Sequence, residues 1–187
     1  ILFNSAWRRG MATREVAQRE YFYYIDLTGR LYLDEDPSAL ASNQVIKEPK
    51  YNIATCIKDV KFLDFFFRRL RPNALQHGAC HLPKYLFVSP CGPELNFLRV
   101  ADTPAVLSRL DADQGRVFYA PSLSVPWEPW RLRISQEGRL YHPGPAGVCS
   151  WALVASHLVS THLQEGIGEP LPGERVDVVA GEAGGGG

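Results

Sequence analysis

The sequence lacks an excess of charge of either sign, and it lacks a long apolar run. Its 20 lysine and arginine residues balance 20 aspartate and glutamate residues, so the formal net charge is zero. A neutral chain has no overall field that would draw it to a phosphate backbone or to anionic lipid. No apolar run approaches the length needed to cross a bilayer. We therefore predict no membrane span and disfavour nucleic acid as a partner.

Cysteine is scarce as well. The four cysteines, Cys56, Cys80, Cys91 and Cys149, are widely spaced and form no CxxC pair. A chain of 187 residues can bury a core without disulfide bonds, so we expect a reducing compartment. The sequence also has no GxSxG elbow and no catalytic-cysteine signature.

Motifs that hold metals and cofactors are missing too. His77, Cys80, His81 and Cys91 could supply four ligands, but their spacing is irregular, whereas zinc sites usually use two closely spaced pairs. The one segment with a clear helical period follows residues 55–59, which contain no glycine to cradle a phosphate. We therefore predict neither a metal nor a cofactor.

What the sequence does contain is a series of glycine-cornered hairpins. Residues 20–25 are rich in aromatic and β-branched side chains, and Gly29 supplies the positive φ of a turn before residues 30–33. Similar strand–turn–strand units are predicted at 85–100, 105–119 and 131–142. A pattern of Gly, Arg, aliphatic and aromatic residues recurs at 29–32, 115–118 and 138–141. We interpret this pattern as repeated turn chemistry and not as a structural repeat.

One segment has the period of an α-helix. Within residues 59–70 the apolar side chains fall on one side, with Asp59 as the N-cap and arginines at the C-terminal end. The members of that apolar side are Phe62, Leu63, Phe66, Phe67 and Leu70. A helix this rich in phenylalanine must dock on a broad apolar surface, and a sheet face is the natural partner. Residues 148–163 fit either a helix or a long strand.

These elements predict an α+β fold, in which an antiparallel, hairpin-rich sheet carries one Phe-rich helix and residues 148–163 are a candidate second helix. We predict a single domain over residues 20–163. Residues 1–19 are expected to form a disordered arm or transit segment, because residues 1–14 contain three arginines and no acid and the only methionine is Met11. Residues 164–187, which end in glycines, are expected to be a flexible or divergent tail.

A group of polar residues around one predicted hairpin is the best candidate for a ligand site. On a strand, Glu94, Asn96 and Leu98 share one face, whereas Phe97 and Arg99 take the other. Glu94 and Asn96 would need partners if they faced the interior, and Arg99 or Arg30 could provide them. The alternative is a structural ion pair or a solvent-facing edge. The predicted ligand-binding residues are Cys91, Glu94, Asn96, Arg99, Asp102 and Arg30.

Ordered blocks of the sequence resemble uncharacterised protein family 0598, a domain of unknown function found in eukaryotes and some bacteria. The blocks are Glu20 to Asp26, Gly29 to Asp34, Thr55 to Asp59, Phe62 to Arg71, Ser89 to Gly92, Asn96 to Arg99 and Gly138 to Pro143. The resemblance spans about residues 19–146. It implies a mitochondrial location and assigns no reaction.

The chain departs from the pattern of that family at three places. Pro93 and Leu95 stand where the family usually carries arginine, so an arginine-based anion site there would be impaired or absent. An insertion at residues 36–52 is longer than expected, and the resemblance fades after about residue 150.

Two functions follow as hypotheses. The first is a non-catalytic binding or assembly module of mitochondria that recognises a protein or a small molecule through a sheet face or a hairpin edge. The second is an enzyme of undefined class, a hydrolase or a transferase, that uses the region of Cys91, Glu94, Asn96, Arg99 and Asp102. Convergence of Glu94, Arg99, Asp102 and a histidine in one concave pocket would favour the enzyme, whereas their separation along an exposed edge would exclude it.

Overall fold

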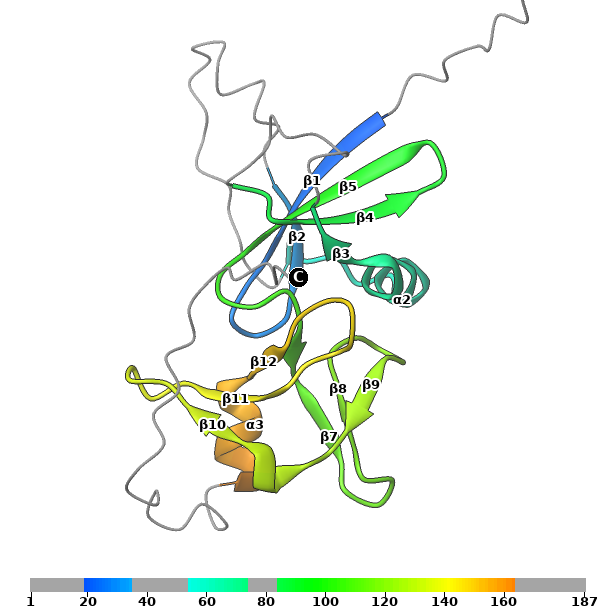
Figure 1. The fold of residues 1–187 in the computed structure, drawn as a ribbon. Helices are drawn as coiled ribbons and strands as arrows, with labels where there is room; N and C mark the ends of the chain where they lie inside the picture. The colour runs from blue at the N-terminus through cyan, green and yellow to red at the C-terminus, as the bar shows by residue number, and fades with distance from the viewer. Residues whose placement is uncertain (1–18, 35–53, 74–83, 164–187) are drawn as a thin grey trace, which may run out of the picture.

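The computed structural model describes residues 19–34, 54–73 and 84–163. Within these residues the strands form three sheets, with strand orders β2-β1-β5-β4-β3, β10-β11-β12-β6 and β7-β8-β9. Figure 1 shows the first sheet and helix α2 as one group and the other two sheets as a second group beside it. The α+β class predicted from the sequence is confirmed. The predicted arm, apart from Arg19, and the predicted tail lie outside the described residues.

The first sheet is built from two hairpins whose inner strands lie side by side. Its strands are β1 (Arg19–Ile25), β2 (Leu31–Leu33), β3 (Arg71–Pro72), β4 (Phe87–Cys91) and β5 (Glu94–Val100). The hairpins β1–β2 and β4–β5 are antiparallel, as predicted. Strands β1 and β5, however, pair in parallel from Arg19 with Glu94 to Ile25 with Val100. The first sheet is therefore mixed: two antiparallel hairpins, as predicted, joined by one parallel pair of strands.

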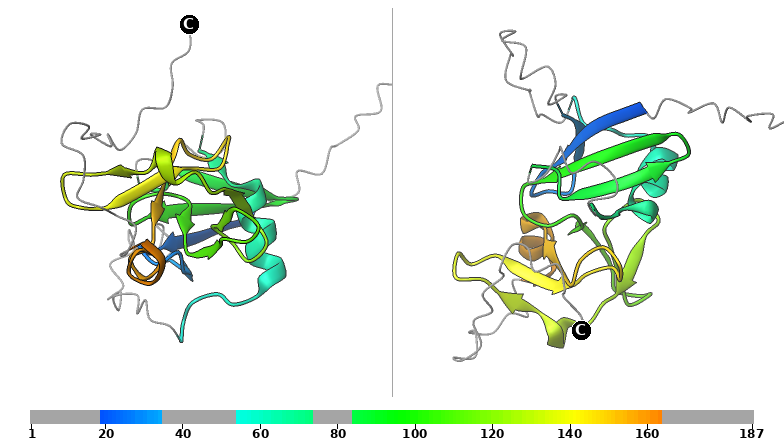
Figure 2. Two further views of the ribbon diagram at one scale, coloured as in Figure 1. Left: turned by 90° about the horizontal axis from the view of Figure 1, so that it is seen from below. Right: turned by 45° about the horizontal axis from the view of Figure 1, so that its top comes forward.

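Helix α2 (Val60–Arg69) begins and ends where its sequence predicts. The Asp59 carboxylate accepts a hydrogen bond from the backbone N–H of Phe62 at 2.7 Å, which satisfies one of the N–H groups left open at a helix start. The helix lies along one face of the first sheet (Figure 2). Ser89 of β4 fixes it there, because the Ser89 hydroxyl donates to the backbone oxygen of Phe66 at 2.8 Å.

The remaining strands depart from the predicted hairpins in one respect. Residues 105–110, predicted as one strand, are divided between β6 (Val106–Leu107) and β7 (Arg109–Asp111). Strand β6 pairs in parallel with β12 (Trp151–Val154), whereas β7 pairs with β8 (Arg116–Phe118), which pairs with β9 (Ser124–Pro126). Two sheets therefore share this stretch of chain.

Residues 131–163 complete the second group. A 3-10 turn (Pro129–Arg131) leads into the predicted hairpin of β10 (Arg133–Ile134) and β11 (Leu140–Pro143). Residues 148–163 contain both elements that the sequence allowed: strand β12, then helix α3 (Ser156–Leu158), which continues as a π-helical turn (Val159–Leu163). No helix in the described part of the chain is long and apolar enough to cross a membrane.

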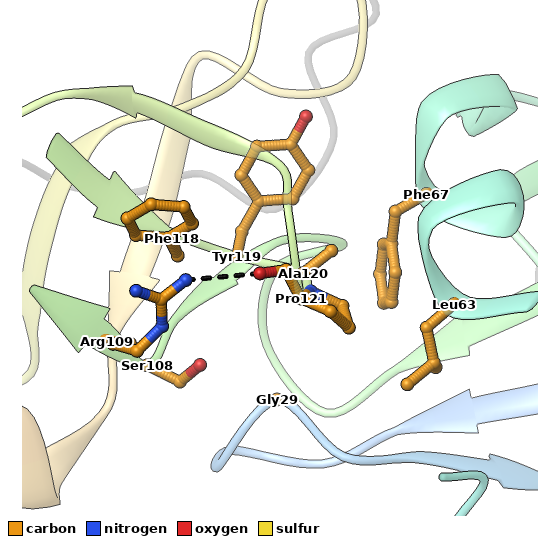
Figure 3. Close-up of a pocket in the computed structure, with 9 residues that line it drawn as sticks. All are labelled: Gly29, Leu63, Phe67, Ser108, Arg109, Phe118, Tyr119, Ala120 and Pro121. Carbon is orange, nitrogen blue, oxygen red and sulfur yellow. Dashed lines mark hydrogen bonds between the residues drawn. The ribbon is translucent and has the colours of Figure 1, made fainter. Parts of the chain in front are cut away.

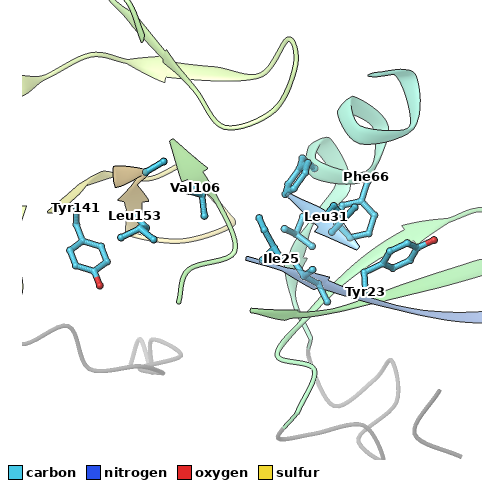
Figure 4. Packing of buried hydrophobic residues seen from close by; sticks show 11 residues of the cluster. Tyr23, Ile25, Leu31, Phe66, Val106, Tyr141 and Leu153 are labelled. Atoms are coloured by element: carbon cyan, nitrogen blue, oxygen red, sulfur yellow. The ribbon is translucent and has the colours of Figure 1, made fainter. Parts of the chain in front are cut away.

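One buried cluster joins the two groups of strands. Phe66 of α2 and Ile25 and Leu31 of the first sheet belong to the same cluster as Val106 and Leu153 of the second sheet. Figure 4 shows these side chains facing one another from the two groups. Two further clusters lie inside the second group and on the face of the first sheet away from α2. The mutual burial of apolar surface holds the two groups together.

The recurring Gly-Arg pattern marks three turns. Gly29, Gly115 and Gly138 each have a positive φ, between 60° and 83°, and each leads into a strand. An L-residue with a side chain seldom adopts this conformation, so glycine is needed at the corner. The interpretation as repeated turn chemistry is confirmed.

A candidate binding cleft between the two groups of strands

The residues predicted for a ligand site on β5 divide between the two faces of the first sheet, as their alternation indicates. Glu94, at the start of β5, forms an ion pair of 2.6 Å with Arg19, its parallel neighbour on β1. Asn96 is buried, and its side-chain amide donates to the backbone oxygen of Ser89 at 2.9 Å. The partners expected for these two residues, Arg99 or Arg30, are therefore replaced by Arg19 and a backbone carbonyl.

Arg99 lies on the opposite face, where it contacts a buried carboxylate. Its Nε donates to Oδ2 of Asp34 at 2.9 Å, and its guanidinium lies 4.2 Å from the centre of the Tyr24 ring. The Asp34 side chain is only 2% exposed and also accepts a hydrogen bond from the Tyr85 hydroxyl at 3.0 Å. This carboxylate links the end of β2 to β5 and to Tyr85 before β4.

Asp102 is held in a third place. Its carboxylate accepts hydrogen bonds from the Arg139 guanidinium and from the Tyr141 hydroxyl, the latter at 2.9 Å. The hydrogen bond that Arg139 donates to Asp102 raises the pKa of Arg139. The pKa of Tyr141 is raised first by burial and then by its own hydrogen bond to Asp102. The network therefore keeps both donors protonated, and it ties the segment after β5 to β11.

The six predicted residues do not meet in one pocket. Cys91 stands opposite Glu94 at the β4–β5 turn, and Arg30 is exposed after the β1–β2 turn, where its backbone N–H donates to Asp26. Glu94, Arg99 and Asp102 each have a separate ionic partner. A ligand-binding role for any of them stays a prediction.

The remaining candidates from the sequence are the possible metal ligands and the buried thiol. His77, Cys80 and His81 lie outside the described residues, and no metal-binding group of three donors occurs within residues 19–34, 54–73 and 84–163. Burial raises the pKa of the Cys149 thiol to about 12. That thiol therefore stays protonated near neutral pH and is a poor nucleophile.

A cleft that the sequence did not predict opens between the two groups of strands. Its volume is about 270 Å³. Gly29 of the β1–β2 turn and two residues of α2 form one side, and the β7–β8 hairpin with the segment after it forms the other (Figure 3). The lining residues are Gly29, Leu63, Phe67, Ser108, Arg109, Phe118, Tyr119, Ala120 and Pro121.

Arg109 is the one charged residue among the described residues that line the cleft. Its guanidinium stacks on the Phe118 ring, 3.5 Å from the ring centre, and donates one hydrogen bond of 3.1 Å to the backbone oxygen of Pro121. Exposed arginine side chains ordinarily lose much rotamer entropy when they are fixed in one position. These two contacts hold the Arg109 guanidinium in place before any ligand arrives.

The segment after β8, residues 119–122, is anchored to α2 across the cleft. The Asp64 carboxylate accepts hydrogen bonds from the backbone N–H and the hydroxyl of Ser122, at 2.8 and 2.7 Å. Phe67 meets the Tyr119 ring edge-on at 6.4 Å, and burial raises the pKa of the Tyr119 hydroxyl. Residues 119–122 therefore form a fixed wall, and Tyr119 stays neutral near physiological pH.

The described lining of the cleft is mixed in character. It combines one fixed cation and the Ser108 and Tyr119 side chains with the apolar surfaces of Leu63, Phe67 and Pro121. The described lining includes no histidine, cysteine or carboxylate that could act as a base on the Ser108 hydroxyl. Sequence reasoning missed the cleft because its walls come from three segments far apart in the chain, and Arg109 has no local motif around it.

A buried histidine in the second group predicts a pH-dependent stability. His142 is 1% exposed, its Nε2 accepts a hydrogen bond from the backbone N–H of Glu128 at 2.9 Å, and its Nδ1 lies 2.8 Å from the Pro143 oxygen. The ring also stacks on Trp127. Burial lowers the pKa of His142 below its ordinary value of 6.5. The unfolded chain therefore binds the proton more readily than the folded chain does.

Acidification through the region below pH 6.5 is expected to lower the free energy of unfolding, by up to about 1.4 kcal/mol per pH unit until the folded-state pKa is reached. Urea unfolding at pH 7.5, 6.5 and 5.5 measures this loss. His142→Gln should be less stable at pH 7.5 and should lose this part of the pH dependence, whereas the exposed His157→Gln should retain it. An unchanged pH profile in His142→Gln would contradict the prediction.

Comparison with known proteins adds a family and no activity. A family model described as a domain of unknown function (DUF4505) matches residues 10–167. The matched range contains every described strand and helix, including all the walls of the cleft. No solved structure matches the chain.

Proposed function

The chain belongs to the family described as a domain of unknown function (DUF4505), and we propose its function from its geometry. We propose that it is a non-catalytic module that binds a small molecule in the cleft between its two groups of strands. One observation carries the proposal. A cation fixed in position lies in a cleft with apolar side chains, and the described lining holds no histidine, cysteine or carboxylate that could act as a base on the Ser108 hydroxyl.

The cleft is also suited to the size of a small ligand. Pockets for small molecules are typically concave, mostly apolar and equipped with a few fixed polar groups, and their volumes begin near about 300 Å³. The volume of about 270 Å³ is slightly below that range, so the cleft suits only a very small ligand. A coenzyme or a nucleotide would not be enclosed, whereas a small organic metabolite would be.

A screen of small organic molecules by ¹H–¹⁵N correlation NMR tests this function. Binding compounds should shift the amide signals of Ser108, Arg109, Tyr119 and Ala120. Ala120→Phe, which fills the cleft, should abolish these shifts, whereas Ala112→Phe at the exposed tip of the β7–β8 turn should not. Binding that survives in Ala120→Phe would contradict the proposed location, and turnover of an unmodified compound would contradict the non-catalytic role.

The proposal includes mitochondria as the compartment and uncharacterised protein family 0598 as the narrower family. The support is the ordered resemblance of sequence blocks to that family, from Glu20-Tyr21 to His142-Pro143. Proximity labelling in cells tests the compartment. Enrichment of mitochondrial proteins is expected, and enrichment of cytosolic or secreted proteins alone would overturn this part of the proposal.

A further inference from the structure

The donors of Arg109 indicate which chemical class the cleft selects. A guanidinium carries five N–H donors in a planar fork. A single hydrogen bond, to the Pro121 oxygen, uses one of them, and no carboxylate pairs with Arg109 among the described residues. Two other exposed arginines differ, because Arg19 and Arg139 are each paired with an acidic side chain. Arg109 is therefore a positioned cation that still has donors to offer to a ligand.

The opposite wall indicates what the anion must be attached to. Leu63 and Phe67 of α2 lie across the cleft from Arg109, with Ala120 and Pro121 between them (Figure 3). Phe67 itself is 2% exposed, so the apolar surface that this part of the cleft still offers comes mainly from the half-buried Leu63 and Pro121 side chains. A ligand that is polar throughout, such as inorganic phosphate, would leave that surface in contact with water. A ligand with an apolar body would remove it from water, at a gain of roughly 25 cal/mol per Å².

The lining also disfavours a ligand that carries a positive charge. No acidic side chain lines the cleft among the described residues, and the nearby Asp64 carboxylate is occupied by two hydrogen bonds from Ser122. An ammonium group in the cleft would therefore contact no carboxylate among the described lining residues, whereas Arg109 would repel it. An amino acid or an amine is less suited to the cleft than a simple acid.

We propose that the cleft binds a small carboxylic acid with a short aliphatic or aromatic body, whose carboxylate pairs with Arg109 and whose body packs on Leu63 and Pro121. The inference rests on the proposed function, because it names the ligand class of the same cleft. An arginine fork matches the two oxygens of a carboxylate, and its fixed position lowers the entropy that binding would otherwise cost.

Titration of the full chain with matched probes, followed by ¹H–¹⁵N NMR, tests the class. Benzoate and hexanoate carry the carboxylate, benzamide and hexanamide keep the same bodies without charge, and benzylamine reverses the charge. We expect the carboxylates to bind about tenfold more tightly than the amides. Arg109→Gln should remove that preference and Arg109→Lys should retain part of it, whereas Arg131→Gln, which changes an exposed arginine paired with Glu128, should leave it intact.

The outcomes separate the class from the function. If the amides or benzylamine shift the cleft signals as strongly as the carboxylates do, the cleft binds small molecules and the carboxylate class is wrong. A preference that persists in Arg109→Gln would also overturn the class, because another group would then hold the anion. If no probe of any charge shifts the cleft signals, both the class and the proposed function fail. Unchanged signal dispersion in Arg109→Gln confirms that this variant folds.

Discussion

Replacing Arg99 with alanine is expected to lower the free energy of unfolding by about 3 kcal/mol. The reason is the carboxylate left behind. The Asp34 side chain is 2% exposed, and Arg99 supplies the positive charge that compensates it at 2.9 Å. Removing the positive partner of a buried ion pair leaves the carboxylate with less compensation in a poorly solvated place, and this costs more than the pair itself contributes. The variant also loses the contact with the Tyr24 ring.

Glu94→Ala is the matched control for Arg99→Ala, since it removes an ion pair from the same strand. The Glu94 and Arg19 side chains are 27% and 62% exposed, so water solvates both charges well. Such surface pairs contribute between about 0 and 1 kcal/mol. Urea unfolding of the two variants gives the comparison. Equal and small losses would show that Arg99 is not needed for stability and would favour its predicted role in ligand binding.

Glu94 and Arg99 show how much of the polar pattern of β5 could be predicted from the sequence. The alternation of the strand correctly assigned Glu94 and Asn96 to one face and Arg99 to the other, because that assignment needs only the period of a strand. The partners could not be assigned. Asp34 is 65 residues from Arg99, and no local pattern marks it as the carboxylate that Arg99 contacts.

The same division between local and distant information runs through the fold. Helix α2 and the turn at Gly29 were predicted because capping, helical period and positive φ depend on neighbours in sequence. The parallel pairing of β1 with β5 was not predicted, because no turn connects these strands and their register depends on burial on both faces. The separation of β6 from β7 was missed for the same reason, since β6 pairs with β12 near the end of the domain.

The cleft could not be predicted because it depends on how the two groups of strands pack. Arg109 and Phe118 face each other across the β7–β8 hairpin, and that local pair follows from the antiparallel register. The apolar wall from Leu63 and Phe67 reaches them only because the cluster around Ile25, Phe66 and Val106 joins the groups. Changes that weaken this cluster should therefore affect the cleft as well as stability.

Phe66→Ala is the sharpest test of that packing, and we expect it to lower the free energy of unfolding by about 3 to 5 kcal/mol. The Phe66 side chain is 1% exposed, and its ring meets the rings of Tyr23 at 5.2 Å and Phe67 at 5.3 Å. Truncation removes these contacts and leaves a cavity that the surrounding β1 and β4 strands cannot fill, because both strands are fixed by their sheet hydrogen bonds.

Phe65→Ala, at the neighbouring position of α2, is the control for Phe66→Ala. Its ring is only half-buried and contacts the Arg69 guanidinium at 4.1 Å, so truncation should cost about 1 kcal/mol. Both variants make the same change within one helix, so the helix propensity of alanine cancels in the comparison of their urea unfolding curves. A loss in Phe65→Ala as large as that in Phe66→Ala would mean that α2 docks through a different face, and the cleft wall built on Leu63 and Phe67 would then be wrong as well.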